Sequence, residues 1–131
     1  MNMIPQAASR PPIHMIDAEA ETLTNLALSV ERRMPAVSAL LLREAERARL
    51  HSAGKMPADV ITMGSVVEFF DDSSDSTRTV TLVYPKDADI AKGQLSILTP
   101  VGAALIGLRA GQSILWPDRC LTVRKVQRPL A

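Results

Sequence analysis

The sequence predicts an α+β protein, in which an antiparallel pair of helices precedes a small antiparallel sheet with one short helix. Between residues 17 and 54 the apolar side chains recur at spacings of three and four, which is the period of an amphipathic helix. After residue 60 the pattern changes to short alternating runs rich in β-branched residues. Helices followed by strands are typical of the α+β class. A length of 131 residues favours one domain, or one domain with a small appendage.

The composition limits the kinds of partner. The chain is 47% hydrophobic but only 3% aromatic, so its core must be aliphatic and a base-stacking site is not expected. The net charge of +1 provides no field to hold a polyanion, so we expect no direct or sequence-specific nucleic-acid binding.

Cysteine usage and hydropathy point to a cellular compartment. Cys120 is the only cysteine, which excludes an internal disulfide or a cysteine-ligated metal site and fits a reducing environment. The sequence contains neither an apolar run of 18 residues nor a hydrophobic signal core at its start. We therefore expect a cytoplasmic protein with no membrane partner.

The first part of the chain is predicted to be a tail followed by a helical hairpin. Residues 1–12 contain three prolines and no periodicity, which predicts a flexible tail. Residues 13–16, "IHMI", fit either a short strand or a hydrophobic entry to a helix. Together with the two helices after them, they form a predicted hairpin, or short coiled coil, over residues 13–54.

Capping signals set the expected bounds of the two helices. Asp17 is a suitable N-cap for the first helix, and Pro35 suits the first turn of the second. The second helix should run about 16 residues, to a C-cap at Gly54. The short loop between the helices makes them antiparallel neighbours. The charged residues of the second helix are expected to face solvent: Arg43, Glu44, Glu46, Arg47 and Arg49.

Residues 55–131 are predicted to form the sheet domain, with residues 55–60 as its linker. The β-branched runs 65–70 and 78–85 should pair as a hairpin, because a polar loop joins them. Three further strands are expected at residues 94–98, 113–116 and 120–126, with a tight turn at 117–119.

A short helix should interrupt the strands near residue 100. Thr99 is a good N-cap and Pro100 fits the first helical position, which predicts a helix of two to three turns. Gly111 then permits the turn into the next strand. The small residues of this helix either let the backbone pack tightly or present a flat apolar surface to a partner. Spacing alone leaves both alternatives open.

A family resemblance is carried by motifs that run in order along the chain. The segments "VITMGSVVEF" and "TRTVTLVYPKDADIAKGQLSILTPVGAALIGLRAGQSILW" resemble the C-terminal domain of the Gre transcript-cleavage factors. The upstream "RPPIHMIDAEAETL" and the joint "KMPADVITMGS" resemble one branch of that family, the regulators of nucleoside diphosphate kinase. The resemblance implies that the sheet domain over residues 55–131 is FKBP-like.

The resemblance also implies a partner. Gre-family proteins dock on RNA polymerase beside its secondary channel through the C-terminal domain, and their long coiled coil enters the channel. The candidate polymerase-binding residues are Leu98, Thr99, Pro100, Val101 and Gly102. A flat apolar patch at these positions could accept a helical surface of the partner. We expect a monomer that occludes the channel or competes there with Gre factors.

The hairpin tip argues against cleavage activity. Cleavage factors of this family carry acidic tip residues that help to hold a catalytic Mg²⁺, which prefers carboxylate ligands. The tip here is "SVERRMPAV", in which Glu31 is the only acid and Arg32 and Arg33 lie beside it. Two arginines make a poor cation site, and the helices are too short to reach deep into a channel. Arg32 and Arg33 either end a solvated helix or contact polymerase.

No catalytic residue, cofactor or metal is predicted. His14 and His51 lie far apart in sequence and are expected in surface or capping roles, while Cys120 is expected to be a buried apolar group. No glycine-rich phosphate-binding loop accompanies a histidine nucleophile, so kinase chemistry is not expected. The alternatives to a binding protein are a transcript-cleavage factor or a prolyl isomerase-like enzyme. The latter needs an aromatic pocket, for which the chain supplies Phe69, Phe70, Tyr84 and Trp116.

Overall fold

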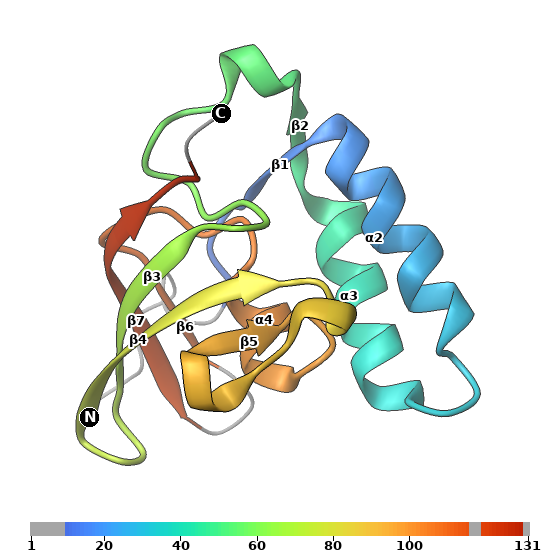
Figure 1. The fold of residues 1–131 in the computed structure, drawn as a ribbon. Helices are drawn as coiled ribbons and strands as arrows, with labels where there is room; N and C mark the ends of the chain where they lie inside the picture. Colours follow the sequence, from blue (N-terminus) through green and yellow to red (C-terminus); the bar gives the residue numbers. More distant parts are fainter. Residues whose placement is uncertain (1–9, 116–118, 130–131) are drawn as a thin grey trace, which may run out of the picture.

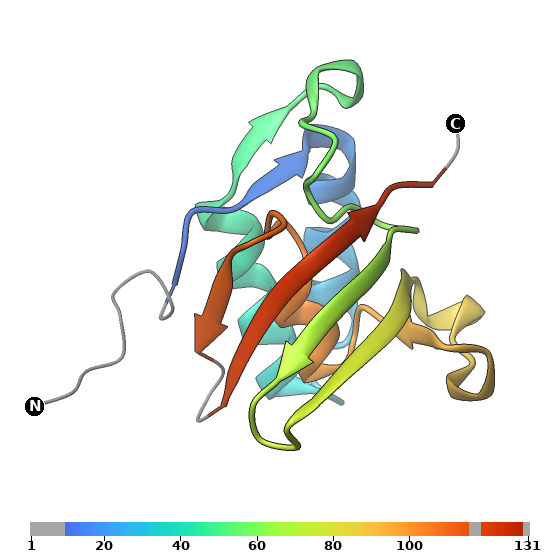
Figure 2. The ribbon, with the colours of Figure 1, turned by 90° about the vertical axis from the view of Figure 1, so that its left-hand side faces the viewer.

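A computed structural model describes residues 10–115 and 119–129 of the chain. A helical hairpin and a short third helix lie on one face of a five-stranded sheet (Figures 1 and 2). This arrangement confirms the predicted α+β class. The hairpin region consists of β1 (His14–Ile16), α2 (Asp17–Ser29), α3 (Pro35–Arg47) and β2 (Arg49–His51). The sheet domain contains β3 (Val66–Asp71), β4 (Ser76–Val83), β5 (Gln94–Ser96), α4 (Pro100–Leu105), β6 (Ser113–Leu115) and β7 (Cys120–Gln127).

Small and aliphatic residues hold the two long helices together. Leu23 of α2 and Leu41 of α3 are fully buried, as their spacing predicts, and so is Ala27, whereas Leu26 is only half-buried. The Ser38 hydroxyl of α3 donates a hydrogen bond to the Ala27 carbonyl of α2 (2.8 Å), which satisfies a polar group inside this contact. The exposed tip, Glu31 to Arg33, joins the helices.

The ends of both helices differ from the prediction. The N-cap of α2 is Ile16 rather than Asp17, whose carboxylate instead accepts a hydrogen bond from the Ala18 N–H (2.7 Å). The helix α3 ends at Arg47 after 13 residues, so it is shorter than expected. It stops because the chain turns into β2, and Gly54 lies in a separate 3-10 turn, η1 (Ala53–Lys55), instead of capping α3.

A two-stranded parallel ribbon closes the base of the hairpin. β1 pairs with β2, which decides residues 13–16 in favour of a strand. The His14 N–H donates to the Gly107 carbonyl (3.0 Å), and the Gly107 N–H donates to the Ile61 carbonyl (3.0 Å). The ribbon is therefore hydrogen-bonded to the sheet domain.

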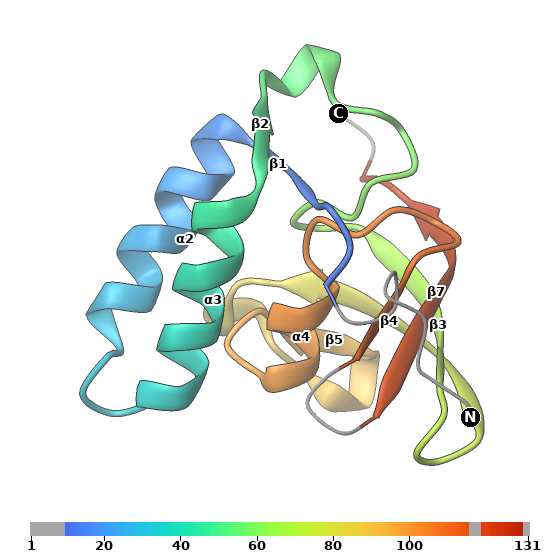
Figure 3. The same ribbon diagram turned by 180° about the vertical axis from the view of Figure 1, so that it is seen from behind.

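One continuous core joins the hairpin to the sheet. Leu41 of α3 belongs to the same buried cluster as Phe69 of β3 and Leu121 of β7. The helix α4 lies between the sheet and α3 (Figures 1 and 3). The expected linker contributes two buried side chains, Met56 and Val60. The boundary between residues 54 and 55 stays a prediction from the sequence.

The sheet has the order β5-β4-β3-β7-β6 and is mixed. The expected β3–β4 hairpin is confirmed, and β7 pairs antiparallel with both β3 and β6. β5, however, runs parallel to β4, so the prediction of a wholly antiparallel sheet was wrong at this pair. Two 3-10 turns between them, η2 (Pro85–Asp87) and η3 (Ile90–Lys92), carry the chain back far enough for a parallel strand.

The described core is aliphatic, as the composition predicts. Phe69 is its one fully buried aromatic side chain within residues 10–115 and 119–129. Trp116 and most of the predicted turn at 117–119 lie outside the described residues.

Candidate docking surface and hairpin tip

Local hydrogen bonds fix the start of α4 as its sequence predicts. The Thr99 hydroxyl accepts from the Gly102 N–H (3.1 Å) and donates to the Ser96 carbonyl (2.7 Å), while Pro100 occupies the first turn. The helix has six residues, fewer than the predicted two to three turns. It ends before Gly107, whose positive φ of 85° reverses the chain.

The small residues of α4 serve tight packing. A Cβ added to Gly102 would lie 2.4 Å from the Ser96 carbonyl oxygen, so only glycine fits there. Ala103 and Ala104 are fully buried. This decides between the two alternatives that spacing left open: the face with Gly102 packs against the preceding backbone and is closed to a partner.

The candidate docking residues are consequently not equally accessible. Leu98 and Gly102 are buried, so they act as support rather than as contact surface. Thr99 and Val101 are half-buried, and Pro100 is exposed. The surface that a partner could touch is centred on Pro100, with Thr99 and Val101 at its sides.

The hairpin tip is basic and exposed. Arg32 and Arg33 lie in the turn after α2, and neither forms an ion pair within the described part of the chain. The Met34 N–H donates to the Val30 carbonyl (2.8 Å) and closes this turn. Each long helix has 13 residues and is therefore about 20 Å long.

The two histidines, which the sequence separates by 37 positions, touch in the structure. His14 Nδ1 and His51 Nε2 are 2.9 Å apart across the β1–β2 ribbon. Burial lowers the pKa of His14 most, and electrostatic interactions with His51, Arg109 and Arg49 lower it further, against an opposing effect of Asp59. These influences favour a neutral His14 imidazole. A neutral imidazole has one nitrogen that can accept a hydrogen bond from the other ring.

The surface or capping roles expected for the two histidines did not include this contact between them. The parallel pairing of β1 with β2 brings them together, and no local signal in the sequence predicts that pairing. Cys120, expected to be buried, is half-buried in the structure.

In the described part of the chain, potential metal ligands and aromatic side chains are dispersed. Among residues 10–115 and 119–129, no three His, Cys, Asp or Glu side chains gather into a group that could hold a metal ion. A pocket beside Tyr84 is lined by no other aromatic from the described ranges. Within those ranges, too, the helices all fall short of the length and apolar character that a membrane span requires.

Comparison with known proteins identifies the family of this chain. Residues 56–126 match the family model described as the C-terminal domain of the transcription elongation factors GreA and GreB. The chain belongs to the GreA/GreB family. The match begins at the expected linker and ends within β7, so it covers nearly all of the sheet domain.

Relatives in this family extend the similarity into the hairpin. The chain is 42% identical over 108 residues to the regulator of nucleoside diphosphate kinase from Escherichia coli K12, covering 82% of this chain and 79% of that one. It is 37% identical over 68 residues to GreA from Agrobacterium fabrum, covering 52% of this chain and only 43% of GreA. A solved GreA/GreB-type structure from Nitrosomonas europaea has a TM-score of 0.72 at 34% identity, covering 90% of this chain and 99% of that one.

Proposed function

We propose that this family member regulates transcription by binding RNA polymerase, as a single copy, beside the secondary channel. The surface around the start of α4 makes the contact, and the protein competes there with Gre factors. The observation that carries the proposal is the match of residues 56–126 to the GreA/GreB C-terminal domain. It is supported by the exposure of Pro100 on a rigid, capped turn.

The proposed protein is a binding protein and does not stimulate transcript cleavage. The tip supplies one carboxylate, Glu31, next to Arg32 and Arg33, and this charge pattern repels a divalent cation. Helices about 20 Å long also give the tip a short reach. The cytoplasmic location of RNA polymerase agrees with the expected compartment.

A pull-down with core RNA polymerase, which measures how much of this protein is retained, tests the docking surface. The double variant Pro100→Asp/Val101→Asp places two charges on the apolar patch, and we expect its retention on core RNA polymerase to fall at least about tenfold. The matched control is Leu50→Asp, which changes an exposed leucine at the base of the hairpin and should be retained like the unmodified protein. Thermal unfolding of all three proteins shows whether they are equally folded. Equal retention of the double variant would remove this surface from the proposal.

Transcript cleavage separates the binding protein from its alternatives. A backtracked complex mixed with this protein should cleave its transcript no faster than polymerase alone, while a GreA added in parallel accelerates cleavage. Strong stimulation would favour the cleavage-factor alternative and contradict our interpretation of the tip. The isomerase alternative has weaker support, because Tyr84 is the one aromatic among the described residues that line this pocket, and such a site needs aromatic walls.

A further inference from the structure

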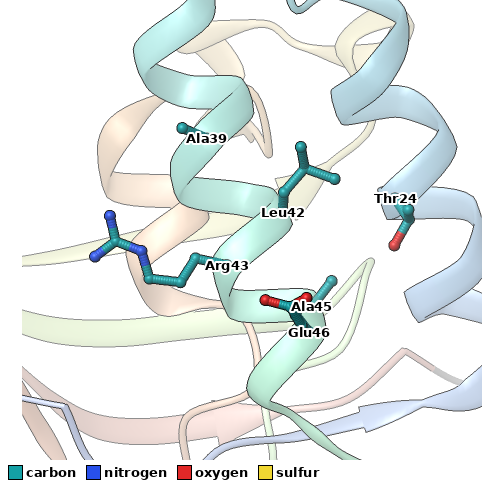
Figure 4. Close-up of a pocket in the computed structure, with 6 residues that line it drawn as sticks. All are labelled: Thr24, Ala39, Leu42, Arg43, Ala45 and Glu46. Carbon is teal, nitrogen blue, oxygen red and sulfur yellow. The ribbon is translucent and has the colours of Figure 1, made fainter.

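The outer side of the hairpin carries an open groove between α2 and α3, on the opposite side from the sheet. In its middle, Thr24 of α2 and Leu42 of α3 point toward the space between the helices (Figure 4). The groove continues to the base of the hairpin, where Asp17, Glu21 and Leu50 line it. We call this surface the outer groove.

The outer groove combines small and aliphatic residues with charged ones: Ala39, Leu42 and Ala45 line its middle together with Arg43 and Glu46. Leu50 at its base is 53% exposed, and Leu28, one helical step beyond Thr24, is 52% exposed. The described residues include only four large hydrophobic side chains that are exposed; of these, Leu50 lines the base of the groove, and Leu28 lies one turn of α2 from Thr24, toward the tip. The Thr24 hydroxyl donates to the Ala20 carbonyl (2.8 Å), and the exposed Arg43 and Glu46 supply one charge of each sign to the middle of the groove.

The two ends of the outer groove carry opposite charges. Asp17 and Glu21 make its base acidic, whereas Arg32 and Arg33 outweigh Glu31 and make the neighbouring tip basic. Consider a second copy, related to the first by a two-fold axis through the middle of the groove, so that the two hairpins run antiparallel. The acidic base of each copy would then face the basic tip of the other. The same operation would bring Leu50 of one copy toward Leu28 of the other. The surface is therefore complementary to itself, as a two-fold interface requires.

We propose that the free protein forms a weak two-fold dimer in which the outer grooves of two hairpins pack antiparallel. This differs from the monomer expected from sequence. Helices about 20 Å long offer a footprint of roughly 400 Å² per copy, below the roughly 800 Å² of a stable interface. The dissociation constant should therefore be on the order of 10–100 µM. The proposal does not depend on polymerase binding.

Sedimentation equilibrium over a concentration series tests the dimer. The average mass should rise from 14.2 kDa in dilute solution toward twice that value at about 0.5 mM. Leu50→Glu should shift the midpoint at least about tenfold upward, because it buries a charge in the interface. Ile90→Glu, at a 73% exposed position in the sheet domain, should leave the midpoint unchanged.

A charge swap tests the antiparallel direction. The double variants Asp17→Lys/Glu21→Lys and Arg32→Glu/Arg33→Glu should each remain monomeric alone, because each sets like charges against one another. An equimolar mixture should associate, since both contacts in the mixed dimer then pair opposite charges. Circular dichroism verifies that each variant is folded.

Three results would overturn the dimer: a mass of 14.2 kDa throughout the series, equal effects of Leu50→Glu and Ile90→Glu, or a monomeric charge-swap mixture. None of them bears on polymerase retention, which is measured separately.

Discussion

Replacing Glu44 by alanine is expected to lower the free energy of unfolding by about 3 kcal/mol. The Glu44 side chain is fully buried on α3, although its charge predicts a solvent-facing position. Its Oε1 atom lies 2.7 Å from Arg47 Nη2, and its Oε2 atom lies 3.0 Å from Arg47 Nε and 3.1 Å from Arg10 Nη1. The carboxylate therefore pairs with two guanidinium groups.

The expected loss comes from the groups that Glu44 leaves behind. Arg47 Nη1 also donates to the Pro11 carbonyl (2.7 Å), so the cluster ties residues 10–12 to α3. Without the carboxylate, Arg47 is left with a largely buried positive charge. Because the Arg47 side chain is 24% exposed, water can relieve part of that cost, which places the estimate at the low end for a broken buried pair.

Urea unfolding of matched variants measures this effect. Glu46→Ala removes an exposed carboxylate two positions along the same helix, and it should change stability by less than about 0.5 kcal/mol. If the two variants lost equal stability, the cluster would contribute nothing beyond ordinary helix effects. A double-mutant cycle with Arg47→Ala would show whether the stability lost in Glu44→Ala comes from the ion pair. A smaller loss in the background without Arg47 would assign that stability to the pair.

Features that depend on neighbouring residues were predictable from the sequence. Two adjacent residues, Thr99 and Pro100, determine the start of α4, and the structure confirms the cap and its hydrogen bond. The burial of Leu23 on α2 and of Val37, Leu41 and Ala45 on α3 follows from the spacing of the apolar residues. In each case the physical cause acts within one or two helical turns, so a local pattern contains it.

Features that depend on distant pairing were not predictable in the same way. The contact between His14 and His51 requires a parallel ribbon, and the burial of Glu44 requires Arg10, 34 positions away. The candidate docking patch shows the same limit. Its residues were identified by resemblance, but the approach of Gly102 to the Ser96 backbone determines which of them can be touched.

Replacing Gly102 by alanine is expected to destabilise the protein by about 3 kcal/mol, although the same change in an ordinary helix stabilises it by about 1 kcal/mol. The added Cβ would lie 2.4 Å from the Ser96 carbonyl oxygen, 3.0 Å from Thr99 Oγ1 and 3.1 Å from Ile97 Cα. Two of these neighbours are backbone atoms, which cannot rotate away. The chain would have to separate α4 from β5, and the Thr99 cap would be strained with it.

Gly54→Ala is the matched control for this change. No atom lies within 4 Å of a Cβ built at Gly54, and its φ is not positive, so alanine should be neutral or slightly stabilising there. Urea unfolding should therefore separate the two variants by at least about 2 kcal/mol. Gly102→Ala should also lose polymerase retention at temperatures where it remains folded, because displacing α4 moves Pro100 and Val101. Full retention by a destabilised Gly102→Ala variant would mean that polymerase does not depend on the position of α4.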